Sequence, residues 1–126
     1  YWKRYATINK QMNFFEEAEF GYRKAVEYGD YQLDTWLFWV DTLLFQGEFT
    51  SAIQTLLQAS EYFPEEFEIE YRLAGLYFML YDDKKGKFHL SNGLRLNFKN
   101  HTILKDLFPT IWDRRMIQNA ITKYKN

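Results

Sequence analysis

The chain has 126 residues, enough for one domain, with a formal net charge of −1 and a pI near 6.2. It has no cysteine and two histidines, which excludes disulfides, thiolate metal sites and a histidine-rich metal site. We expect no nucleic-acid partner, because the net charge gives no basic footprint, and no membrane span, because the apolar stretches are too short.

A spacing of 34 residues organises the whole chain. Gly and Pro are few, at 6 and 2, which favours long helices. Small residues recur every 34 positions, at Ala18, Ala52, Gly86 and Ala120. A column of large residues recurs at the same spacing, at Tyr5, Trp39, Leu73 and Leu107. A period of this length predicts paired helices that bury their apolar faces by stacking.

The first repeat, at about 1–32, divides into two predicted helices. Met12-Asn13 interrupts it, and Tyr28-Gly29-Asp30 ends it. Trp2 aligns with Trp36 of the next repeat.

The second repeat, at about 33–66, has the clearest helical pattern. Its first helix carries apolar residues at i, i+3, i+4 and i+7, namely Trp36, Trp39, Val40 and Leu43. Gln46-Gly47-Glu48 separates it from a second apolar series that contains Ala52, Leu56 and Ala59. Pro64 ends the repeat at a position where its missing N–H costs nothing.

The third repeat, at about 67–100, follows the pattern with one substitution. Glu70 stands where the earlier repeats have tryptophan, and Tyr81-Asp82-Asp83 separates the helices. Residues 101–126 form a divergent capping repeat, because Pro109 falls inside its first helix. We predict a short helix near Thr102–Leu107, a break at Phe108 and one long last helix from about Thr110.

These features resemble the tetratricopeptide repeat (TPR) family. The best match is the series Trp36, Trp39, Val40, Leu43, Ala52, Leu56, Ala59 and Pro64. The resemblance implies an all-α fold of antiparallel helix-turn-helix repeats, stacked into a right-handed α-solenoid over a single domain, 1–126. It also implies a non-catalytic scaffold or adaptor that holds a protein or peptide in a concave groove.

In the family, the first helix of each repeat lines the groove. The first repeat contributes Lys3, Thr7, Lys10 and Gln11 to that lining. The aromatic floor and its orienting charges come from later repeats, and the predicted partner-binding residues are Leu37, Phe38, Asp41, Phe45, Tyr71, Arg72 and Phe78. The carboxylate clamp of some members is not expected: Lys3 and Arg72 match it, but its other positions hold Thr7, Phe38 and Glu68.

Three alternatives stay open for the aromatic lining. It binds a partner, it is covered by the terminal helix with Ile111 and Trp112, or it pairs with a second copy of the chain as a homodimer. The chain is also compatible with an accessory segment of a larger protein.

No pattern in the chain indicates catalysis. No glycine-rich phosphate loop, metalloprotease motif or nucleophile motif occurs, so we predict no enzyme activity, no metal and no cofactor. Asp82-Asp83 is interpreted as a solvated turn and Arg114-Arg115 as a solvated helix face. Without cysteine or a signal peptide, we expect a cytoplasmic protein.

Overall fold

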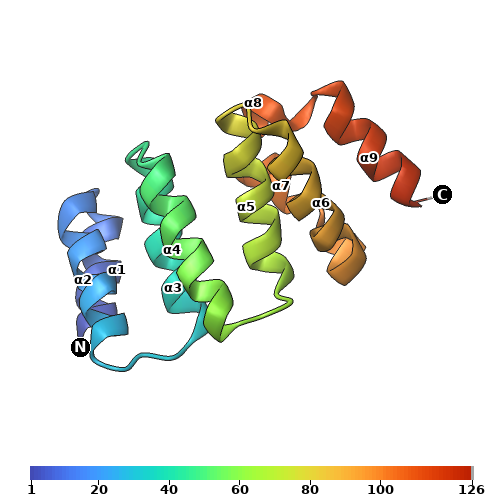
Figure 1. The fold of residues 1–126 in the computed structure, drawn as a ribbon. Helices are drawn as coiled ribbons and strands as arrows, with labels where there is room; N and C mark the ends of the chain where they lie inside the picture. The colour runs from blue at the N-terminus through green and yellow to red at the C-terminus, as the bar shows by residue number, and fades with distance from the viewer. Residues whose placement is uncertain (126) are drawn as a thin grey trace. The chain divides into compact units, whose positions relative to one another are not determined.

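The computed structural model describes residues 1–125, which fold into α-helices and one 3₁₀-helix without any strand (Figure 1). The prediction of an all-helical chain is confirmed for these residues. The elements are α1 (Trp2–Gln11), α2 (Phe15–Glu27), α3 (Leu33–Phe45), α4 (Phe49–Tyr62), α5 (Phe67–Met79), α6 (Asp83–Asn97), η1 (Phe98–Asn100), α7 (Ile103–Leu107), α8 (Pro109–Trp112) and α9 (Arg115–Lys125).

The helix boundaries recur every 34 residues. Helices α1, α3 and α5 end at residues 11, 45 and 79, and helices α2, α4 and α6 begin at residues 15, 49 and 83. The spacing seen in the side chains is therefore also a spacing of secondary structure.

The turn inside each hairpin recurs as well. Asn13, Gly47 and Tyr81 adopt left-handed backbone with φ of 63°, 74° and 60°. In each turn the next residue donates its N–H to a carbonyl five positions back; in the second, Glu48 N–H bonds Leu43 O at 2.9 Å. This Schellman arrangement satisfies carbonyls that the end of a helix otherwise leaves unpaired.

The chain forms two compact units, Tyr1–Glu61 and Tyr62–Asn126. In the N-terminal unit, α2 packs against both α1 and α3. Ala18 and Ala52 of the small-residue column are fully buried there, and so are Ala6 and Val40. Trp39 Nε1 donates to Glu19 Oε1 at 3.1 Å and so links α3 to α2.

In the C-terminal unit, α5 packs against α6, α7 and α8, and α6 packs against α9. Two glycines of α6 allow α5 to approach closely. A Cβ at Gly86 would lie 2.8 Å from the Phe78 ring, and a Cβ at Gly93 would lie 2.7 Å from the Tyr71 ring. Gly86, which belongs to the small-residue column, and Gly93 therefore each face a large ring of α5.

The capping repeat differs from the prediction in one respect. The short helix α7 and the break at Phe108 occur as expected, and Pro109 is the first residue of α8. The single long helix from Thr110 is wrong, because Asp113 and Arg114 separate α8 from α9. Gln118 Nε2 donates to Trp112 O at 2.7 Å, which satisfies a carbonyl at the end of α8 and stabilises the interruption.

Candidate partner-binding surface

The predicted binding residues fall into two groups with different environments. Leu37, Phe38, Asp41 and Phe45 belong to α3 in the N-terminal unit. Tyr71, Arg72 and Phe78 belong to α5 in the C-terminal unit.

On α3, two of the predicted aromatic rings are accessible. Phe38 is 36% exposed and Phe45 is 68% exposed, whereas Leu37 is buried and Asp41 is half-buried. Phe15 of α2 stacks on Phe45 with ring centroids 5.8 Å apart and planes inclined by 17°. The position of Phe45 is therefore set by packing while much of its ring faces solvent.

Two lysines of α1 lie over these rings. Lys3 Nζ is 5.8 Å from the centroid of Phe38, and Lys10 Nζ is 5.7 Å and 5.6 Å from the centroids of Phe38 and Phe45. Ammonium groups at such distances are attracted by the ring quadrupole. We call the surface formed by Lys3, Lys10, Phe38 and Phe45 the α1–α3 aromatic surface.

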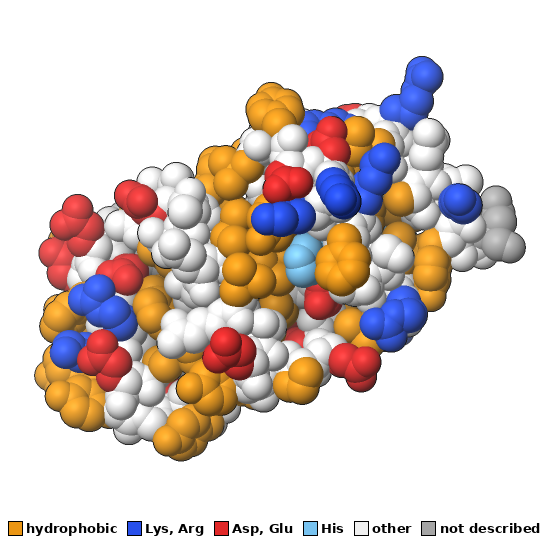
Figure 2. All heavy atoms as spheres, viewed as in Figure 1, with side chains coloured by type: hydrophobic (Ala, Val, Ile, Leu, Met, Phe, Trp, Pro, Cys, Tyr) orange, Lys and Arg blue, Asp and Glu red, His pale blue; other side chains and the backbone are white. Residues whose placement is uncertain are grey.

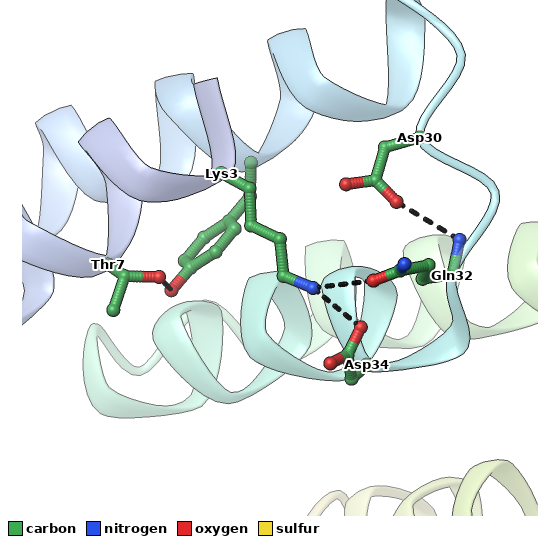
Figure 3. A network of polar contacts seen from close by, with 6 residues as sticks. Lys3, Thr7, Asp30, Gln32 and Asp34 are labelled. Carbon is green, nitrogen blue, oxygen red and sulfur yellow. Dashed lines mark hydrogen bonds and ion pairs between the residues drawn. The ribbon is translucent and has the colours of Figure 1, made fainter. Parts of the chain in front are cut away.

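A polar network at one end of this surface joins α1 to the start of α3 (Figure 3). Lys3 Nζ donates to Asp34 Oδ1 at 2.8 Å and to Gln32 Oε1 at 2.9 Å. Gln32 N–H in turn donates to Asp30 Oδ1 at 3.0 Å. A surface ion pair of this kind contributes roughly 0–1 kcal/mol, so its main effect is to orient Lys3.

A second contact holds α1 against α2 beneath the surface. The hydroxyls of Thr7 and Tyr22 lie 3.1 Å apart (Figure 3). Burial raises the pKa of Tyr22 above its ordinary value, while the Thr7 hydrogen bond opposes that rise. Thr7, which was predicted to line the groove, also helps to fix the helix pair.

On α5, the expectation of an accessible aromatic floor is wrong. Tyr71 and Phe78 are 0% exposed, because their rings fill the space that Gly93 and Gly86 of α6 leave open. The Tyr71 hydroxyl donates to Asn97 O at 2.7 Å, and burial raises the pKa of Tyr71 far above its ordinary value. Both rings therefore belong to the core of the α5–α6 pair.

Arg72 is also buried, at 7% exposed. Its guanidinium donates to Glu68 O at 3.1 Å and lies 3.6 Å from the Glu68 carboxylate, one turn earlier on α5. An arginine held in this way by its own helix is poorly placed to orient a ligand.

The capping repeat covers part of α5, one of the alternatives left open by the sequence. The Phe108 ring occupies the position where a side chain at Gly75 would extend. Thr110 Oγ1 donates to Met79 Sδ at 3.4 Å, and Arg114 donates to Phe78 O at 2.7 Å. Arg114 also lies over the Tyr81 ring at 4.8 Å, so the interpretation of this arginine as solvated is wrong.

A contact between Glu70 and His89 explains why the third repeat has Glu70 at the position where the first two repeats have Trp2 and Trp36. His89 Nδ1 lies 2.6 Å from Glu70 Oε2, and the His89 ring stacks on Tyr77 at 5.5 Å. Asn92 Nδ2 donates to the same Glu70 oxygen at 3.4 Å. These partners, 19 and 22 residues away, replace the packing of a tryptophan by a polar contact between α5 and α6.

Neither models of known protein families nor curated proteins match this sequence. The surface is therefore interpreted from its own chemistry. Within residues 1–125, no three His, Asp or Glu side chains gather in a way that could hold a metal ion. No helix in that part of the chain is long and apolar enough to cross a lipid bilayer.

The sequence predicted that Lys3 and Lys10 line the groove. The 34-residue period placed them at the site, because they occupy the columns of Leu37 and Phe78. Their contacts with the two phenylalanines were not visible, because they depend on how α1 lies beside α3.

Proposed function

We propose that this protein is a non-catalytic interaction module of the TPR type, which binds a peptide or protein segment. The proposal includes a right-handed α-solenoid of helix-turn-helix repeats, the arrangement that the sequence predicted. Its support is the 34-residue recurrence of helix boundaries, of left-handed turn residues and of small residues at helix contacts.

The observation that carries the binding proposal is the accessibility of Phe38 and Phe45 beside the lysines of α1. Large rings that packing holds in place, yet leaves open to solvent, are typical of interface hot spots. They would bury an apolar side chain of the partner, with Asp41 of the same helix setting its orientation. Tyr71 and Phe78 are left out because they belong to the α5–α6 core, and Leu37 and Arg72 are left out because they are buried.

Self-association is the second candidate function, and a specific observation favours it. Ile8, Met12 and Phe14, on α1 and the turn that follows it, are 45%, 52% and 51% exposed. Exposed apolar residues grouped in this way are common at interfaces. Sedimentation equilibrium of the wild-type chain and of Ile8→Ser/Met12→Ser tests this candidate: a dimer that the substitutions dissociate would establish it.

Affinity capture from the native source tests the leading proposal. Phe38→Ala/Phe45→Ala should lose partners that the wild-type chain retains, by about tenfold or more, while the melting temperature stays nearly unchanged. Leu57→Ala on α4, where Leu57 is 43% exposed, is the matched control and should capture like wild type. Equal capture by the double variant and the control would contradict the proposal.

A further inference from the structure

The net charge of the chain is near zero, but its positive and negative residues are distributed unevenly along the sequence. Residues 83–126 hold ten of the 16 Lys and Arg residues but only three of the 17 Asp and Glu residues. Helix α9 has no acidic residue, and α6 has only Asp83 at its first position. Two helices that pack together therefore form a basic face, and Figure 2 shows Lys and Arg side chains gathered over α6 and α9.

A hollow of about 430 Å³ lies between these two helices. Its floor is apolar, since Leu94 is 2% exposed and Ala120 is half-buried. Its rim is formed by three exposed residues, which are Lys87 and Ser91 of α6 and Lys123 of α9. Tyr124 completes the lining, and these residues together define the α6–α9 hollow.

The two rim lysines have no acidic partner within residues 1–125. The basic face also continues along α6, where Lys84, Lys87, Ser91 and Arg95 follow one another at helical spacing on exposed positions. Two cations beside an apolar floor are complementary to a segment with carboxylates on either side of an apolar side chain.

We infer that the α6–α9 hollow binds an acidic segment of a partner protein. An apolar side chain of that segment fills the hollow above Leu94 and Ala120, and its flanking carboxylates accept hydrogen bonds from Lys87 and Lys123. This site involves helices other than α1 and α3, so it goes beyond the proposed function and does not depend on it.

The same chemistry favours a peptide over a nucleic acid. Phosphates need no apolar floor, and the bases of a single strand need open ring faces on which to stack. The Tyr124 ring already stacks on Phe98, with centroids 6.0 Å apart and planes inclined by 13°. One face of this ring is therefore not available to a base.

Fluorescence anisotropy with the full chain tests this inference. The probe is a fluorescein-labelled peptide of repeated Glu-Glu-Leu units, compared with a peptide in which Ser replaces Leu and with a labelled oligothymidylate. Wild type should bind the Glu-Glu-Leu peptide more tightly than either comparison probe, and added salt should weaken the binding.

Three variants locate the site. Lys87→Glu/Lys123→Glu should weaken binding about tenfold or more, and Ser91→Phe should weaken it by filling the hollow without changing the charge. Arg4→Glu/Lys105→Glu makes the same charge change at exposed positions elsewhere and should bind like wild type. Circular dichroism of every variant should show unchanged helicity, because all the altered side chains are exposed.

Several results would overturn the inference. These are no binding of the Glu-Glu-Leu peptide by wild type, equal loss in the rim and control variants, or retained binding in Ser91→Phe. Tighter binding of oligothymidylate, lost in the rim variant, would identify a nucleic-acid surface instead. None of these results bears on the capture experiment with Phe38 and Phe45, so the two proposals can fail separately.

Discussion

Individual side chains decide which surfaces of this protein are open. Phe45 and Phe78 both lie near the ends of first helices, yet one is 68% exposed and the other 0% exposed. The difference comes from Gly86, which leaves room for the Phe78 ring beside α6. The two rings lie in adjacent columns of the repeat, and the sequence predicted both to line the groove, so repeat position alone did not separate the buried ring from the exposed one.

Phe78→Ala should destabilise the protein by about 3–5 kcal/mol, because it leaves a cavity between α5 and α6. Phe45→Ala should cost far less, since most of that ring already faces solvent. Urea unfolding followed by circular dichroism measures both changes. Similar losses for the two variants would contradict the assignment of Phe78 to the core and Phe45 to the surface.

Tyr71 should make stability depend on pH in the alkaline range. Burial raises its pKa above the ordinary value of 10.0, so the folded state favours the protonated hydroxyl. This stabilisation is complete below pH 10 and is lost as the pH rises above that value, where the unfolded chain ionises first. Melting temperatures measured across this range should fall more steeply for wild type than for Tyr71→Phe; parallel curves would contradict the explanation.

At the scale of helices and turns, the 34-residue period predicted turn positions that the conformational preferences of single residues do not indicate. Gly47 is an expected left-handed residue, whereas Tyr81 is not, because a β-carbon disfavours that conformation. The spacing nevertheless placed a break at both positions. The interruption between α8 and α9 could not be predicted, because it depends on Gln118 reaching back to Trp112 O and on Arg114 reaching Phe78 O.

Gly47→Ala should destabilise the protein by about 1 kcal/mol. A β-carbon at Gly47 would meet no atom within 4 Å, so the cost would arise from the left-handed backbone, at φ 74°, and not from crowding. Chemical denaturation gives the difference directly, and a neutral result would show that the turn adapts to another conformation.

Ala52→Leu should destabilise by about 1–3 kcal/mol, because Ala52 is fully buried on α4 and the added atoms would overpack its contacts. Thr50→Leu, at an exposed position of the same helix, controls for the change in side chain. Equal stabilities of the two variants would show that the small-residue column does not limit helix packing.

For the molecule as a whole, the sequence predicted the all-helical class, which is confirmed for residues 1–125. The capping role of residues 101–126 stays a prediction. The sequence could not predict how α7 and α8 cover α5, because the contact of Phe108 with Gly75 joins residues of two different repeats. It also missed the basic face of α6 and α9, since a net charge summed over the chain conceals where the charges lie.

Deleting residues 101–126 should expose the apolar face of α5 that α7 and α8 cover, together with the face of α6 that α9 covers. We expect aggregation or partial unfolding, because terminal repeats with polar outer faces keep stacked repeats soluble. Size-exclusion chromatography and circular dichroism would reveal either outcome. A monomeric, fully helical 1–100 fragment would show that this segment is not a cap.

Site-specific photocrosslinking tests the central proposal, partner binding at the α1–α3 aromatic surface, most directly. Benzoylphenylalanine replaces Phe45 in one variant and Leu57 in another, and both are irradiated in extract from the native source. We predict a discrete crosslinked partner from position 45 and none from position 57. Crosslinks absent at position 45, or equally strong at position 57, would contradict the proposal.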